Sequence, residues 1–128
     1  MKQGINTIYR NIANEFSERV SSLLGAQVHA VVLYGSVARR QAKRESDIDT
    51  LVVAADHRAR GKVLDIAYEL EKGTEFEAFV SVVYFTRDDV YRIHSLGSPF
   101  IASIVEDGII LYDDGTFAEL LERVPASR

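Results

Sequence analysis

This chain contains two aspartates whose chemical type and spacing suit a catalytic site. Asp47 and Asp49 occupy positions i and i+2, so on an extended strand both carboxylates point to the same face. Two such carboxylates repel each other in water. A divalent cation such as Mg²⁺ takes oxygen ligands from both, and substrate phosphates complete its coordination shell. The pair therefore predicts a metal site that acts on a phosphate-bearing substrate.

A Gly-Ser pair supplies the second half of this predicted site. Gly35 and Ser36 directly follow an apolar, β-branched run at 28–34, which predicts a buried strand, and we expect a short helix over 36–43. Backbone N–H groups at a helix start bind anions, and glycine lets the backbone approach a phosphate closely. Ser36 adds a hydroxyl and Arg39 a cation one turn later. The basic loop at 39–44 would attract a polyanionic nucleotide.

Hydrophobic periodicity and turn residues predict the elements that position these groups. We expect strands over 28–34, 47–54, 75–85 and 109–112, with Asp47 and Asp49 at the start of the second. Helices are expected over 4–24 and 58–72, from Thr86 onward, over 99–106 and over 116–123. This alternation indicates an α/β (α+β) domain with a small sheet, and we expect a single domain over 1–128.

Composition narrows the function classes further. The formal net charge is −4, so a nucleic-acid acceptor is not favoured. The absence of cysteine and of any long apolar run predicts a soluble, cytoplasmic protein without a membrane segment. The three histidines show no ligand spacing and are interpreted as structural or surface residues. The pair Asp113-Asp114 is interpreted as a solvated turn. The aromatic residues are interpreted as core: Phe76, Tyr84, Phe85 and Phe100.

The segment Gly35-Ser36-Val37-Ala38-Arg39, followed by Ser46-Asp47-Ile48-Asp49, resembles the signature of the minimal nucleotidyltransferases of the DNA polymerase β superfamily. That signature has a Gly-Ser-x-Ala-Arg-Gly segment, a short variable loop and a Ser-Asp-x-Asp segment. The resemblance extends loosely over nearly the whole chain. It implies a polymerase β-like nucleotidyltransferase fold with a small mixed sheet flanked by helices.

The resemblance also implies roles for individual residues. Asp47 and Asp49 would bind two Mg²⁺ ions, while the nucleoside triphosphate would be held by the residues Gly35, Ser36, Arg39 and Ser46. The chain departs from the family pattern at Arg40, where glycine is usual, and at Phe79, where a third carboxylate is expected. Glu77 is two positions away on the same face of the expected strand, so we predict that it serves as the third metal ligand and catalytic carboxylate.

The function implied is Mg²⁺-dependent transfer of a nucleoside monophosphate, AMP from ATP, to a hydroxyl acceptor. The acceptor is expected on a helical partner protein of the HEPN type, because minimal nucleotidyltransferases pair with such proteins as antitoxins. A homo-oligomer is also possible. The alternative is a catalytically weakened module that binds nucleotide or sequesters its partner, a hypothesis motivated by Phe79. A small-molecule nucleotidyltransferase, such as those that modify aminoglycosides, normally needs a second domain that this length does not accommodate.

Overall fold

A computed structural model describes residues 4–123 of the chain. Within these residues, four strands form one sheet in the order β3-β2-β1-β4. β1 runs antiparallel to β2 and β4, and β2 runs parallel to β3. The sheet is therefore mixed, as predicted, and consists of β1 (Val28–Tyr34), β2 (Ile48–Ala54), β3 (Val80–Thr86) and β4 (Ile109–Asp113).

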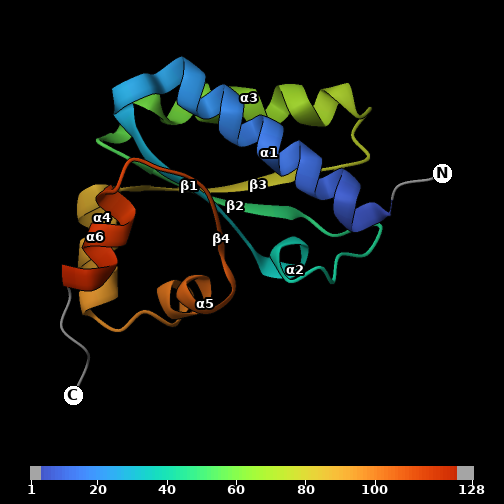
Figure 1. Cartoon of the computed structure of the whole chain (residues 1–128). Helices are drawn as coiled ribbons and strands as arrows, with labels where there is room; N and C mark the ends of the chain where they lie inside the picture. The colour runs from blue at the N-terminus through green and yellow to red at the C-terminus, as the bar shows by residue number, and fades with distance from the viewer. Residues whose placement is uncertain (1–3, 124–128) are drawn as a thin grey trace.

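Helices cover both faces of the sheet (Figure 1). One face carries α1 (Ile5–Leu24) and α3 (Arg60–Gly73), the second of which connects the parallel strands β2 and β3. The opposite face carries α4 (Arg87–Ser95), α5 (Pro99–Asp107) and α6 (Thr116–Arg123). A four-residue helix, α2 (Gly35–Ala38), follows β1, and two 3₁₀ turns occur at Gly25–Gln27 and His57–Ala59. Within residues 4–123, every helix is too short or too polar to span a lipid bilayer.

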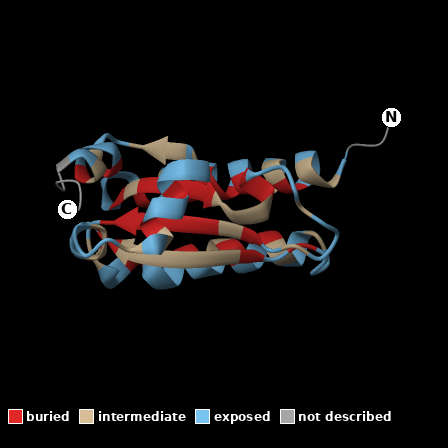
Figure 2. Cartoon of the chain, turned by 90° about the horizontal axis from the view of Figure 1, so that it is seen from below, coloured by how far each residue is buried: buried red, intermediate tan, exposed pale blue. Residues whose placement is uncertain are grey.

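Alternate residues of the strands supply two cores, one on each side of the sheet. Val31 and Leu33 of β1 pack with α1 and α3, whereas Val32 packs with α4, α5 and α6. Buried residues are concentrated in β1 and β2, whereas β3 and β4 are mostly intermediate and the outer faces of the helices are exposed (Figure 2). On β2, Leu51 belongs to the α4–α6 core. Because strand side chains alternate, Asp49 lies on that same side.

The helix after β1 is shorter than predicted. The expected helix over 36–43 ends instead at Ala38. Its last turn closes with a hydrogen bond from the N–H of Arg40 to the carbonyl of Val37, and another from the N–H of Gln41 to the carbonyl of Ser36. This pattern is a Schellman motif, whose C′ residue takes a left-handed conformation. Here that residue is Arg40, with φ 60°.

The third strand begins later than predicted, at Val80 rather than at residue 75. α3 ends in a second Schellman motif, in which Glu75 (φ 56°) occupies the left-handed position and Phe76 (φ 63°) follows it in the same region. Glu77 consequently lies in a loop and not on β3. Phe76 is 44% exposed, so its assignment to the core was wrong. Its ring packs instead at a tilt of 52° against Tyr68, with centroids 5.8 Å apart.

Replacing Arg40 by glycine is expected to stabilise the fold. A left-handed conformation costs a residue with a Cβ about 1–2 kcal/mol, and α4 ends in the same motif with glycine, Gly97 (φ 77°), in this position. We expect Arg40→Gly to raise the free energy of unfolding by about 1 kcal/mol in denaturant titration. Arg39→Gly is the matched control, because Arg39 has φ −82° and loses the same charge. A gain in the control as large as in Arg40→Gly would contradict the argument.

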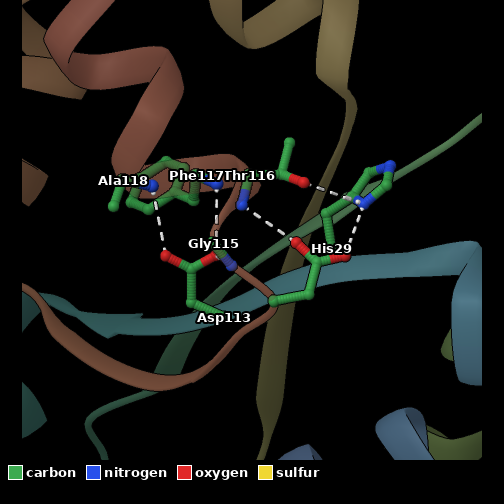
Figure 3. A network of polar contacts seen from close by, with 7 residues as sticks. His29, Asp113, Gly115, Thr116, Phe117 and Ala118 are labelled. Carbon is green, nitrogen blue, oxygen red and sulfur yellow. Dashed lines mark hydrogen bonds and ion pairs between the residues drawn. The ribbon is translucent and has the colours of Figure 1, made fainter.

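The chain reversal between β4 and α6 is an exposed turn, as expected, and its two aspartates also form a hydrogen-bonded cap (Figure 3). The Asp113 carboxylate accepts the backbone N–H of Gly115 before α6 and those of Phe117 and Ala118 in its first turn. Asp114 lies 2.9 Å from Nδ1 of His29 on β1. Thr116 contacts the same nitrogen at 3.3 Å. Both partners therefore use one side of the ring, and the network attaches α6 to β1.

Candidate functional site

Gly35 and Asp49 are in direct contact where β1 ends beside the start of β2. Gly35 has φ +76°. A Cβ at this position would collide with Oδ2 of Asp49 and lie 3.2 Å from its Cγ. Glycine is therefore required twice, once by its backbone conformation and once by the carboxylate that occupies the place of a side chain. The predicted Gly-Ser and Asp-x-Asp segments are thus brought together by the β1–β2 pairing.

The register of the sheet surrounds Asp49 with two residues that the sequence did not indicate. Tyr34 pairs with Asp49 across β1 and β2, and Ser81 pairs with it across β2 and β3. Paired residues share a face of the sheet. The Tyr34 ring packs edge-on against Phe100 of α5, with centroids 5.1 Å apart. Only knowledge of the register could have placed Tyr34 and Ser81 beside the carboxylate.

Electrostatics link Asp49 to Asp47 and Arg39. Burial raises the pKa of the Asp49 carboxyl, the negative charge of Asp47 raises it further, and Arg39 opposes both effects. Burial and the charge of Asp49 together raise the pKa of Tyr34 to about 12. The negative charge of Asp47 therefore destabilises the charged form of Asp49. A divalent cation relieves this repulsion, so the donor set fits Mg²⁺ held by Asp47 and Asp49, with phosphate oxygens as further ligands.

The raised pKa of Asp49 sets the sign of a pH dependence. The native state holds this proton more tightly than the unfolded chain, whose carboxyl has its ordinary value near 3.8. The contribution of Asp49 to the free energy of unfolding is therefore lost as the pH rises from the pKa of the unfolded chain through the raised pKa of the native state. We expect the free energy of unfolding of the wild type, measured relative to Asp49→Asn, to fall across this window.

The control for this measurement is Asp56→Asn, because Arg58 lowers the pKa of Asp56. Relative to that variant, the stability of the wild type should rise with pH over the acidic range, since the unfolded state then binds the proton more tightly. Denaturant titrations between pH 3 and 6 give both differences. Slopes of the same sign for the two aspartates would contradict the environment described for Asp49.

The other predicted nucleotide-binding residues lie around the short helix α2 and its loop. Ser36 is in the first turn of α2, which has only four residues. Phosphate binding there would depend on free N–H groups and the hydroxyl rather than on a sizeable helix dipole. Arg39 donates from Nε to Oε1 of Gln41 at 3.3 Å. The Ser46 hydroxyl accepts the N–H of Lys43 at 2.8 Å, closing the turn that leads into Asp47.

Glu77 is not gathered with the two aspartates. Among residues 4–123, no three His, Asp or Glu side chains are close enough together to hold a metal ion. Glu77 and Ser46 contribute to the lining of an open groove of about 960 Å³ beside the first half of α1. Phe79 also lines this groove and is 48% exposed. Its carbonyl accepts the N–H of Ile48 at 2.9 Å, so position 79 lies alongside the Asp-x-Asp segment.

Solved structures with this arrangement of elements include toxin–antitoxin complexes. A crystal structure of a toxin–antitoxin with AMP-PNP is 18% identical, with a TM-score of 0.56, and the match covers 84% of this chain and 79% of that one. A tri-AMPylated Shewanella oneidensis HEPN toxin in complex with its MNT antitoxin is also 18% identical, with a TM-score of 0.52 and coverages of 88% and 79%. At such identities the likeness shows the fold alone.

The family is shown by sequence. No curated protein matches this chain. Residues 11–116, however, match the family described as polymerase beta, nucleotidyltransferase. That range contains Gly35, Ser36, Asp47 and Asp49 and extends from α1 to the start of α6. The chain therefore belongs to the polymerase β nucleotidyltransferase family.

Proposed function

We propose that this chain transfers AMP from ATP to a hydroxyl group, with Mg²⁺ bound by Asp47 and Asp49. The observation that carries this proposal is the contact between the Gly35 backbone and the Asp49 carboxylate, with the charge of Asp47 beside it. Carboxylates adjoining a glycine turn place a cation next to backbone donors for phosphate. Family membership supports nucleotidyl transfer as the reaction class.

In the proposed reaction, Gly35, Ser36, Arg39 and Ser46 hold the triphosphate and orient its α-phosphorus. The acceptor oxygen forms a bond to that phosphorus as the bond to pyrophosphate breaks, and the hydroxyl proton passes to solvent. When bound, Mg²⁺ supplies charge neutralisation on the phosphate oxygens and on the leaving pyrophosphate. The partly buried position of Asp49 restricts water around the reacting groups, which strengthens these electrostatic contacts.

We further propose that the acceptor hydroxyl belongs to a helical partner of the HEPN type. The support is the pairing of HEPN toxins with MNT antitoxins in a structurally similar complex, in which the toxin is AMPylated. The test is co-expression with a HEPN protein, followed by intact-mass analysis of that protein. We expect a mass increase of whole AMP units with the wild type and none with Asp47→Asn/Asp49→Asn. A partner that stays unmodified with both proteins would contradict the transfer.

Two further expectations accompany this proposal. The absence of cysteine agrees with a reducing compartment, and we propose the cytoplasm. A nucleic-acid acceptor remains disfavoured, because the net charge is −4.

The missing third carboxylate favours a second candidate function, a module that binds nucleotide or its partner without efficient transfer. Its basis is the absence, among residues 4–123, of a third acidic side chain beside Asp47 and Asp49. In this case the chain would bind Mg²⁺–ATP through two carboxylates and act on its partner by sequestration. Binding and transfer therefore have to be measured separately.

Substitutions at positions 77 and 79 distinguish the two candidates. We expect Glu77→Ala to leave Mg²⁺-dependent ATP binding unchanged within about twofold, because an exposed loop side chain contributes little. We expect Phe79→Asp to accelerate transfer, since position 79 is hydrogen-bonded to Ile48 between the two aspartates. Phe79→Asn is the matched control without charge. Loss of transfer in Glu77→Ala would instead assign Glu77 as the third ligand.

A further inference from the structure

A small pocket on the outer side of α2 is lined by hydrogen-bond donors and cations. Its volume is about 340 Å³, and Ile109 of β4 closes one side. β4 lies on the opposite side of β1 from β2, which carries Asp49. The pocket is therefore distinct from the carboxylate pair. Its polar lining comes from α1 and from the turn after α2 and contains no acidic residue: Asn6, Thr7, Arg10, Asn11 and Arg40.

Arg10 is the first sign that this pocket binds an anion. Its Nε is buried and has no hydrogen-bond partner among the described residues. Arg10 also forms no ion pair within residues 4–123, where the arginines that do so are Arg19, Arg58 and Arg92. A buried guanidinium N–H without an acceptor costs free energy, because it has lost water and gained nothing in return. Arg10 also lines the pocket, so an anion there would accept hydrogen bonds from the other N–H groups of its guanidinium.

Arg40 is the second sign. Its left-handed backbone, with φ 60°, is the conformation that favours glycine, and the chain nevertheless places a guanidinium there, on the rim of the pocket. Arg40 likewise has no carboxylate partner within the described residues. Strained residues that persist in a fold are concentrated where they contact ligands. Arg40 is thus both a strained residue and, after Arg10, the second arginine of this pocket without an ion pair among the described residues.

Asn6 completes the donor set. Its Oδ1 accepts the N–H of Ala42 at 2.9 Å, which fixes the amide and leaves its NH₂ group as a donor. Two guanidinium groups, an oriented amide and the hydroxyl of Thr7 match the several acceptor oxygens of a phosphate group, which guanidinium forks bind with two parallel hydrogen bonds. We propose that this pocket binds the phosphate group of a small molecule, at a site separate from the nucleotide triphosphate.

The test is a titration of ¹⁵N-labelled full-length protein with inorganic phosphate at constant ionic strength, with chloride as the compensating anion. We expect saturable shifts of the Arg10 Nε–Hε signal and of the backbone amides of Thr7 and Ala38. Arg10→Gln and Arg40→Gln should each weaken binding about tenfold, as read from the two amides. Arg19→Gln is the matched control, because it removes the same charge from the same helix outside the pocket, and should leave binding unchanged.

Several outcomes would overturn the proposal, and each has a distinct signature. Equal weakening by Arg10→Gln and Arg19→Gln would indicate unspecific attraction. Shifts confined to the amides of Gly35 and Ser36 would place phosphate at the nucleotide site. Saturation by acetate but not by phosphate would assign the pocket to carboxylates of an acidic protein partner. Asp47→Asn/Asp49→Asn changes no residue of the pocket, so this double variant should still bind phosphate there. The phosphate titration therefore tests the pocket independently of the proposed nucleotide function.

Discussion

Asp47→Asn/Asp49→Asn should abolish Mg²⁺-dependent binding of ATP, while the wild type binds ATP with the metal and not without it. Each substitution keeps the size of the side chain and removes the charge that a hard cation requires. The asparagine side chains of the variant would not hold Mg²⁺, so the negative charge of the triphosphate beside Gly35 and Ser36 would not be neutralised. Calorimetric titration with and without Mg²⁺ measures this directly, and we expect affinity to fall by more than about a hundredfold, as for loss of a metal ligand set.

The folded state is the control for this loss. Because burial and Asp47 both raise the pKa of Asp49, the ionised carboxylate is held at a cost in the native protein. The double variant should therefore unfold at a denaturant concentration no lower than that of the wild type at neutral pH. Loss of ATP binding together with loss of stability would leave the metal role of the aspartates unsupported. ATP binding in the wild type without any metal dependence would contradict that role directly.

Gly35→Ala is expected to have the second largest effect, on stability and on nucleotide binding together. The new methyl group would collide with Oδ2 of Asp49, and φ +76° is strained for alanine. A left-handed alanine alone costs about 1–2 kcal/mol, and displacement of the carboxylate adds to this. We expect a lower midpoint of denaturant unfolding and loss of detectable ATP binding.

Two comparisons assign the cause of this expected loss. Gly25 also has a positive φ of 54°, but no atom lies within 4 Å of the position that a Cβ would occupy there, so Gly25→Ala carries the backbone strain without the collision. It should lower stability and keep ATP binding. Asp49→Ala removes the colliding Oδ2, so Gly35→Ala should lower stability less in an Asp49→Ala background than in the wild type. Full ATP binding in Gly35→Ala would show that the contact with Asp49 is not needed.

The central part of the site was predictable because its residues are close in sequence and follow strong patterns. The run 28–34 indicated β1, and Gly35, Ser36, Asp47 and Asp49 mark the ends of two strands that pair with each other. The mixed sheet flanked by helices is also confirmed. The prediction of the site depends on the alternation of side chains along a strand and on the conformational freedom of glycine, which are local properties of the chain. The mixed sheet was instead implied by the resemblance to the minimal nucleotidyltransferases.

The errors have a shared physical cause. Arg40, Glu75 and Phe76 adopt left-handed conformations that a sequence pattern assigns to glycine, so the early end of α2 and the turn between α3 and β3 were not visible. The strand predicted from residue 75 therefore began five residues early, and Glu77 was placed on β3 although it lies in the loop before that strand. Tyr34 and Ser81 were missed for a different reason, because neighbours across strands are fixed by register and not by local sequence.

The central position of β2 has a consequence for how the candidate site opens. β2 is hydrogen-bonded on both edges, by β1 and β3, and residues Thr50 to Ala54 are fully buried. Backbone amides in such a strand exchange with solvent only when the whole domain unfolds, whereas loops open locally. We therefore expect Asp49 to be carried by the slowest-exchanging part of the chain, and the segments of Glu77 and Arg40 to open locally. Any adjustment to a bound nucleotide would consequently come from the loops, against a fixed carboxylate.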